Sequence, residues 1–187
     1  MNKQQLRTRF LNKRNTLSKE DVKEKSKLIF NHFFDDIEMV ECLCVHCFLP
    51  IIKNNEIDTT ILINELQKRN IQVVVPVSNF NTHEMEAALY SPQTPLTIKK
   101  GIPEPTDPQH IDPNLIDLMI LPLAIFDNKG FRIGYGGGFY DRFLAKLESK
   151  PKLIGVSFFE AIDDIYPNEF DVPLDYCLTP SKTYFFK

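Results

Sequence analysis

The sequence of 187 residues predicts an α/β fold in which a mainly parallel central sheet is flanked by helices in three layers, with a basic helix at the N-terminus. Apolar segments of strand length alternate with helical patterns, which is typical of βαβ units. Several of these strands are apolar on both faces, as strands are when helices cover a parallel sheet. Five of the seven glycines lie between Gly130 and Gly138, directly after one such strand. They indicate a loop whose backbone something must approach closely.

The first element is a helix near residues 1–14 with a basic face. This segment contains five basic residues and no acidic one, and two apolar residues lie four positions apart, which is helical spacing. Lys3, Arg7 and Arg14 fall on nearly one line of such a helix, because seven residues make about two turns. This basic stripe (Lys3, Arg7 and Arg14) has two interpretations: it could contact phosphates, or it could be a solvated helix face.

Three further helices follow. Ser18 and Asp21 have the spacing of a capping box, which predicts the start of the second helix. Asp58 or Thr59 can cap the third helix. The fourth helix is predicted from about Phe139 to Leu147, after the glycines.

Strands account for the apolar segments between these helices. They are expected at residues 39–50, 71–76, 84–90, 97–99, 117–123, 153–158, 176–178 and 183–186. The stretch 101–116 is rich in Pro and Asp and predicts a loop.

The length and composition predict a single domain of ordinary size that spans residues 1–187. The chain is 43% apolar with a net charge of −3, so it lacks the positive charge of a typical nucleic-acid binder. No apolar run reaches the ~18 residues of a membrane helix, and the N-terminus has no stretch resembling a signal sequence. We expect a cytoplasmic protein that acts as a monomer and binds neither nucleic acid nor membrane.

The glycine-rich segment from Gly130 to Arg142 is the main candidate for a binding site. It follows a buried strand and opens a helix, where parallel sheets bind ligands. Backbone N–H groups with no side chains in the way favour phosphate. The segment is neither a G-x-x-x-x-G-K-[ST] loop nor G-x-G-x-x-G, because Phe139 occupies the last glycine's place after Gly134 and Gly136. The alternative is a flexible loop or a tight turn.

Several carboxylates have two interpretations each. Asp141 would repel bound phosphates unless a cation such as Mg²⁺ intervenes, or it is an ordinary first-turn acid that the helix dipole favours. Glu56 could pair with an amidine-like edge of a ligand, or it could help to open a helix. Six carboxylates lie between residues 156 and 175. One or two of them could help to hold a metal, and most are surface charges.

A zinc site is not favoured at Cys42, Cys44, His46 and Cys47. On a strand, residues 42, 44 and 46 would point the same way at spacings of ~6–7 Å, which is a poor tetrahedral cage. Core packing is the favoured interpretation, and the cysteine spacing does not suit a disulfide framework either.

Five segments form a recognisable series. The longest contains Asp117-Leu118-Met119-Ile120-Leu121-Pro122, then Phe126-Asp127, Gly130 and Arg132-Ile133-Gly134-Tyr135-Gly136-Gly137-Gly138-Phe139-Tyr140-Asp141-Arg142. The others are Lys3-Gln4-Gln5-Leu6-Arg7 with a further basic residue at Arg14, Phe48-Leu49-Pro50 with Glu56-Ile57-Asp58-Thr59, Gly101-Ile102-Pro103-Glu104-Pro105, and Asp171-Val172-Pro173-Leu174-Asp175. By these residues, and by their order along the chain, the five segments resemble the 5-formyltetrahydrofolate cyclo-ligase family over most of the sequence.

The resemblance implies a ligase that uses ATP and Mg²⁺ to convert 5-formyltetrahydrofolate into 5,10-methenyltetrahydrofolate, with release of ADP and phosphate. ATP would phosphorylate the formyl oxygen, and N10 of the folate would then close the ring. The nucleotide-binding residues that the resemblance implies are Lys3, Gln4, Gln5, Leu6, Arg7, Arg132, Ile133, Gly134, Tyr135, Gly136, Gly137, Gly138, Phe139 and Tyr140. Arg7 and Lys3 are implied as catalytic residues, Asp141 and Asp175 as metal ligands, and Leu49, Glu56, Tyr135, Gly136, Gly137, Gly138 and Phe139 as the folate pocket.

Two other functions are compatible with parts of the pattern. A sugar-phosphate isomerase or acyl-transfer enzyme would need a carboxylate base near the phosphate loop and no ATP. A nucleotide- or RNA-binding module would use the basic N-terminus and exposed aromatic residues, but the net charge of −3 disfavours it.

Overall fold

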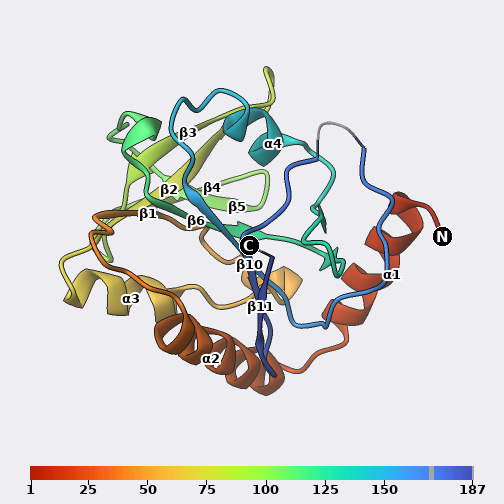
Figure 1. Ribbon diagram of the computed structural model, residues 1–187. Coiled ribbons are helices and arrows are strands. Elements are labelled where there is room, and N and C mark those ends of the chain that lie inside the picture. The colour runs from red at the N-terminus through yellow and green to blue at the C-terminus, as the bar shows by residue number, and fades with distance from the viewer. Residues whose placement is uncertain (169–170, 187) are drawn as a thin grey trace.

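The computed structural model describes residues 1–168 and 171–186. Within them a seven-stranded sheet has the order β11-β10-β9-β6-β1-β2-β3 (Figure 1). The five inner strands run parallel, and the edge strands β3 and β11 pair antiparallel with their neighbours. These strands are β1 Cys44–His46, β2 Gln72–Asn79, β3 Glu84–Leu89, β6 Leu118–Pro122, β9 Lys152–Val156, β10 Tyr176–Leu178 and β11 Thr183–Phe185. The predicted α/β fold with a mainly parallel sheet is confirmed.

Two short hairpins lie outside this sheet. One pairs β4 (Leu96–Lys99) with β5 (Ile102–Pro105), and the other pairs β7 (Ile125–Phe126) with β8 (Arg132–Ile133). Single 3₁₀ turns occur at Ile52–Asn54 and Pro113–Leu115.

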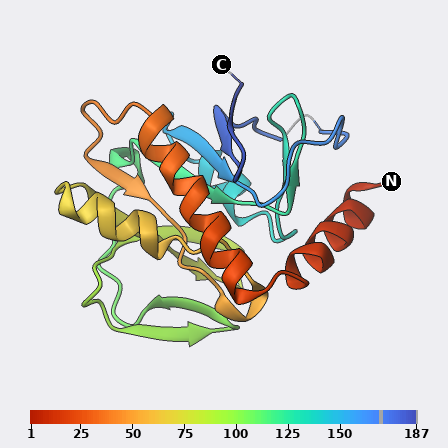
Figure 2. The same cartoon turned by 90° about the horizontal axis from the view of Figure 1, so that it is seen from below.

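Helices cover both faces of the sheet. α2 (Lys19–Asp36) and α3 (Thr60–Lys68) lie together on one face (Figure 2), and α4 (Phe139–Leu144) lies on the other. Alternation along β1 explains why both faces are apolar. Val45 packs in the core with α2 and α3, whereas Cys44 packs in the opposite core with Phe143 of α4.

The N-terminal helix α1 (Lys3–Asn15) stands apart from these layers in Figures 1 and 2. Leu6 and Phe10 are buried in a small cluster with Ile125 and Ile133 of the β7–β8 hairpin. This apolar stripe docks the helix beside the hairpin, so its basic side chains are carried to the segment that follows β8. No helix of the described residues is long and apolar enough to cross a membrane.

Element boundaries differ from the prediction in several places; the β7–β8 hairpin, for example, was not expected. The strand expected at 39–50 is limited to Cys44–His46, because residues 39–42 form a turn in which the Cys42 N–H donates to the Met39 carbonyl. The loop expected at 101–116 contains β5, which tolerates its prolines because each strand of a two-stranded sheet has an open edge. The fourth helix ends at Leu144 rather than near Leu147.

The helix starts predicted at Ser18 and at Asp58 or Thr59 are both confirmed. Ser18 and Asp21 form the expected capping box. At α3, Thr59 is the N-cap by position, but it is the Asp58 carboxylate that accepts the Thr60 N–H, at 3.1 Å. The Thr59 hydroxyl instead donates to the Phe48 carbonyl, at 2.7 Å, and so ties the helix start to the end of the β1 segment.

Candidate functional site

A cavity of about 400 Å³ lies where the parallel strands β6, β1 and β2 end. The sheet contributes Pro122, Pro76, Ser78 and Met85, the segment after β1 contributes Phe48, Leu49, Ile51 and Glu56, and the β4–β5 hairpin contributes Ile102 and Pro103. Lys3 and Arg7 of α1, all residues from Arg132 to Asp141, and Asn168 and Asp171 complete the wall. Parallel sheets place ligand sites at this edge.

The glycine loop forms one end of the cavity. Gly136 and Gly138 have φ of +95° and +66°, a region that favours glycine. A Cβ on Gly136 would lie 3.3 Å from Cζ of Arg7, and one on Gly138 would lie 2.8 Å from Nη1 of Arg142. None of the described residues accepts a hydrogen bond from the N–H of Gly136, Gly137 or Gly138. These amides are therefore available to an anion.

Two cations of α1 face this loop. The Arg7 Nε donates to the Gly134 carbonyl at 2.8 Å, and Lys3 forms an ion pair with Asp171. The predicted basic stripe therefore faces the glycine loop rather than solvent. That position follows from the Leu6 and Phe10 contacts, which fix the rotation of the helix about its axis.

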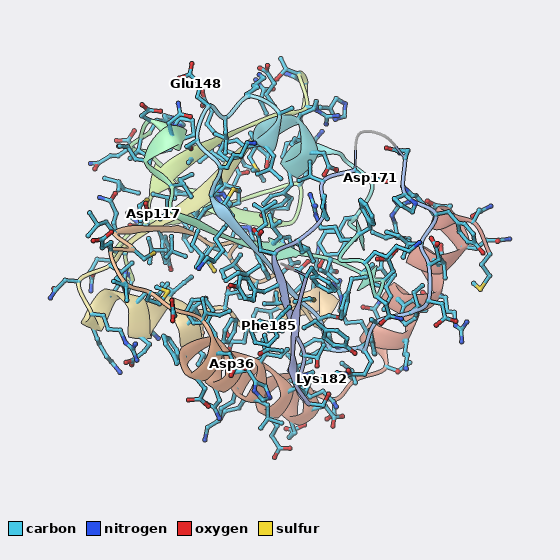
Figure 3. All side chains as sticks on the ribbon, in the orientation of Figure 1. Asp36, Asp117, Glu148, Asp171, Lys182 and Phe185 are labelled. Atoms are coloured by element: carbon cyan, nitrogen blue, oxygen red, sulfur yellow. The ribbon has the colours of Figure 1, made fainter. Side chains whose placement is uncertain are left out.

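Arg132 bonds a carboxylate and a backbone carbonyl at the same end. Its Nη2 donates to Asp141 at 2.6 Å and its Nη1 donates to the Val172 carbonyl at 2.7 Å. Burial lowers the pKa of the Arg132 guanidinium, while the nearby Asp141 and Asp171 oppose that shift. Figure 3 labels Asp171 on the segment that faces α1. One end of the cavity thus holds three cations, two carboxylates and a row of free amides.

The other end of the cavity contains a buried carboxylate. Glu56 is 4% exposed, and its Oε2 accepts the Ile51 N–H at 2.9 Å. Burial raises the pKa of Glu56, and the Ile51 N–H, Arg14 and Tyr135 partly offset this rise. Leu49 is buried beside it. A planar ligand edge with adjacent N–H donors would suit this carboxylate.

Most of the predicted site residues meet in this cavity, and three of the α1 residues have other roles. The Gln5 side chain completes a capping box with Asn2, Leu6 is buried in the docking cluster, and Gln4 accepts a hydrogen bond from Arg7. These three residues position the helix that carries Lys3 and Arg7.

Asp175, like Gln4, Gln5 and Leu6, is a predicted site residue that does not line the cavity. Its Oδ2 accepts the Leu153 N–H at 2.7 Å, and it directly precedes β10. Leu153 is near the start of β9, so Asp175 lies at the amino end of the parallel strands, whereas Asp141 lies at the carboxyl end. The expectation that Asp175 shares a site with Asp141 is corrected: beside Asp141, the carboxylate that lines this end of the cavity is Asp171.

Cys44, His46 and Cys47 are buried in the core, as predicted, but Cys42 is half-buried in the turn before β1 and not on the expected strand. Cys44 and Cys47 are buried in opposite cores, and burial raises the pKa of the Cys44 thiol to about 12. In residues 1–168 and 171–186, no three His, Cys, Asp or Glu side chains are grouped to hold a metal by themselves.

A family model described as the 5-formyltetrahydrofolate cyclo-ligase family matches residues 1–180. The chain belongs to that family. A 5-formyltetrahydrofolate cyclo-ligase from Haemophilus influenzae is 31% identical over 178 residues, which cover 92% of this chain and 94% of the relative. One from Escherichia coli is 34% identical over 137 residues, which cover 70% of this chain and 75% of the relative. The expected enzyme class, a 5-formyltetrahydrofolate cyclo-ligase, is confirmed.

Solved structures agree with this membership. The NMR structure of an Aquifex aeolicus 5,10-methenyltetrahydrofolate synthetase has a TM-score of 0.83 and 27% identity, and the match covers 100% of this chain and 94% of that one. A synthetase from Mycoplasma pneumoniae has a TM-score of 0.78 and covers 96% of this cyclo-ligase family chain, but at 24% identity it supports the fold alone.

Several cavity residues are not predicted from the sequence, and two cases show why. Asp171 begins the Asp171–Asp175 motif, and its ion pair with Lys3 and its place in the cavity wall distinguish it from Asp175. Ile102 and Pro103 lie in a quoted motif that was assigned to a loop. Their place in the wall depends on how the β4–β5 hairpin folds over β2.

Proposed function

We propose that this chain converts 5-formyltetrahydrofolate into 5,10-methenyltetrahydrofolate at the expense of Mg-ATP. One observation carries the proposal: a single cavity has free glycine amides and three cations at one end and a buried carboxylate at the other. Such a cavity suits two substrates at once, with phosphates at the first end and a donor-rich ring at the second. Family membership supports the same assignment.

The phosphate end supplies charge and position for phosphoryl transfer, which needs little else from a protein. The amides of Gly136, Gly137 and Gly138 would bind phosphate oxygens, and Arg7 and Lys3 would approach the transferred phosphoryl group from α1. Arg7 already bonds the Gly134 carbonyl, so its guanidinium lies next to the loop before any ligand binds. We assign Arg7 and Lys3 as the catalytic residues.

The carboxylates of this end fit a Mg²⁺ ion that ATP brings. Asp141 and Asp171 both line the cavity and both are paired with cations, Arg132 and Lys3. Mg²⁺ in such sites takes one or two carboxylates and completes its shell with phosphate oxygens and water, so a group of three protein ligands is not required. When bound, it would neutralise charge that develops on the phosphates.

The folate end orients the reacting groups. Glu56 would accept adjacent N–H donors of the pterin, while Leu49, Phe139 and the wall prolines exclude water from the activated formyl group. A formamide oxygen leaves poorly as water but well as phosphate. Phosphorylation of that oxygen therefore lets N10 attack the formyl carbon. N10 gives up its proton, which the departing phosphate takes, and the ring closes as the C–O bond to phosphate breaks. The transfer of the phosphoryl group to the formyl oxygen needs no general base.

The test is an assay of purified protein with 5-formyltetrahydrofolate and Mg-ATP. Methenyl product is followed by its absorbance, and ADP by a coupled assay. We expect the two products in a one-to-one ratio, and only when both substrates and Mg²⁺ are present. Formation of ADP without methenyl product would support the phosphate site but contradict 5-formyltetrahydrofolate as the second substrate. Folded protein that forms neither product would overturn the proposal. A cytoplasmic location and a monomeric state stay predictions.

A further inference from the structure

Arg14, near the end of α1, lies behind the folate end of the cavity without lining it. It is only 8% exposed. Its Nη1 donates to the Tyr135 hydroxyl, its Cζ lies 5.1 Å from the centroid of the Tyr135 ring, and its Nη2 is 3.9 Å from Oε1 of Glu56. Arg14 therefore touches two side chains of the cavity wall from their far side.

Simple packing does not explain an arginine at this position. Burial of a guanidinium is costly unless its donors are satisfied, and the Nε of Arg14 has no hydrogen-bond partner among the described residues. An apolar side chain would dock the helix at lower cost, as Leu6 and Phe10 do. The cost is offset only through the two groups that Arg14 contacts, Tyr135 and Glu56.

We propose that Arg14 is a positioning residue for the folate pocket, which holds the Glu56 carboxylate and the Tyr135 ring in the orientation that receives the substrate. The inference rests on the proposed function, because it assigns Arg14 to the folate rather than to ATP. It also separates the three cations of the stripe: Lys3 and Arg7 serve the phosphate end, and Arg14 serves the opposite end.

The contact between α1 and the Glu56 loop does not depend on the Arg14 guanidinium. Asn55, in a left-handed conformation with φ of +49°, donates from Nδ2 to the Leu17 carbonyl at 2.8 Å. This bond joins the segment after α1 to the residue before Glu56. Substitution of Arg14 therefore tests orientation within the pocket while the helix stays docked.

Kinetics of Arg14→Met should separate the two substrates. We expect the folate KM to rise at least about tenfold, because truncation of one partner of a buried charged pair leaves the other misplaced and unpaired. The ATP KM and kcat should stay within about twofold of wild type. The matched control is Arg9→Met, the same substitution at an exposed position of the same helix, which should change neither KM.

A second readout would not respond to a merely structural role. The titratable groups that face Glu56 are Arg14 from α1, Tyr135 from the glycine loop and Tyr140 from α4. Loss of the Arg14 charge removes one of the neighbours that favour ionised Glu56, so the acidic limb of kcat/KM for folate should move to higher pH. Arg14→Lys, which retains a charge, should leave this limb closer to its wild-type position.

A double-mutant cycle with Glu56→Gln completes the test. The folate KM effect of Arg14→Met should shrink in the Glu56→Gln background, because the interaction is already absent. An equal effect in both backgrounds, an unchanged folate KM, or a parallel rise in the ATP KM would overturn the inference. If Arg14→Met does not fold, Tyr135→Phe removes the same hydrogen bond and should also raise the folate KM. Wild-type protein without cyclo-ligase activity would instead refute the proposed function.

Discussion

The two ends of the parallel strands use aspartate in opposite ways. At the amino end, Asp117 accepts the N–H groups of Leu43 and Cys44, both at 2.8 Å, and Asp175 accepts that of Leu153 at 2.7 Å. At the carboxyl end, Asp141 and Asp171 pair with the side chains of Arg132 and Lys3. Figure 3 labels Asp117 and Asp171 on opposite sides of the molecule.

The difference shows which carboxylates are free to bind a ligand. A carboxylate that accepts hydrogen bonds from backbone N–H groups at the start of a strand cannot turn to a ligand without leaving those N–H groups unpaired. A carboxylate that pairs with a side chain can exchange that partner for a bound cation, because lysine and arginine side chains can rotate toward incoming phosphates. The amino end is therefore suited to stability and the carboxyl end to binding.

The largest expected effect is that of Asp141→Ala. We expect Mg-dependent turnover to fall on the order of 10²–10³-fold, because charge stabilisation of phosphoryl transfer is lost. The measurement is the steady-state rate of methenyl product as a function of Mg²⁺ concentration. Asp163→Ala, which alters an exposed carboxylate, is the control. Near-normal turnover of the Asp141 variant would remove it from the metal site.

The comparison between the two ends is tested most directly by Asp171→Ala and Asp175→Ala. Asp171→Ala should lower turnover at least about tenfold, because it removes a carboxylate from the proposed Mg²⁺ site. The second should keep turnover but reduce the free energy of unfolding by about 1–3 kcal/mol, because the Leu153 N–H loses its acceptor. Urea unfolding and turnover, measured on both variants, give the result. Inactive but stable Asp175→Ala protein would contradict the assignment.

Between the two ends of the strands, the buried His46 should make the free energy of unfolding depend on pH. It is fully buried under Tyr140 and Phe143, and burial lowers its pKa to about 3. The unfolded chain binds a proton below about 6.5 and the folded chain does not, so this group costs stability as the pH falls. We expect about 2 kcal/mol of loss between pH 7 and pH 5.

The measurement is urea unfolding at the two pH values, with wild type and His46→Leu compared. The variant should lose less stability on acidification by about the same 2 kcal/mol. His110→Leu, at an exposed position, serves as the control. An identical pH dependence in wild type and His46→Leu would show that His46 is not neutral and buried in solution.

The smallest effect is expected from Gln5→Ala. The Gln5 side chain is engaged in the capping box with Asn2, so its loss should cost about 0.5–1 kcal/mol of stability. The ATP KM should not change, because the side chain of Gln5 does not line the cavity. A substantially higher ATP KM, in protein of near wild-type stability, would show that Gln5 contributes to nucleotide binding.

The order of helices and strands was largely predictable, because buried strands and capped helices have local signals. The Ser18–Asp21 box and the apolar β6 and β9 segments are examples. Local signals failed at β5, where prolines suggest a loop but the strand pairs along one edge only. They also failed at residues 39–42, where an apolar pattern does not reveal a turn.

The candidate site was predictable to the extent that its residues are close in sequence. The segment from Arg132 to Asp141 lines one cavity wall, as a glycine cluster after a buried strand indicates; its phosphate ligand stays a prediction. Asp171 and Asp175 were harder to distinguish, since they are four residues apart in one motif. The choice between them depends on which backbone or side chain each carboxylate meets.

By itself, the sequence determined the fold class, the glycine loop and the basic face of the first helix, because each depends on spacing within a short segment. The tertiary structure decided which charges act together. Docking of Leu6 and Phe10 on the β7–β8 hairpin turns that face toward the glycine loop. It places Arg14 against Glu56, 42 positions later in the chain, and Lys3 against Asp171. Such pairs are set by the packing of distant segments, for which a single sequence contains no local signal.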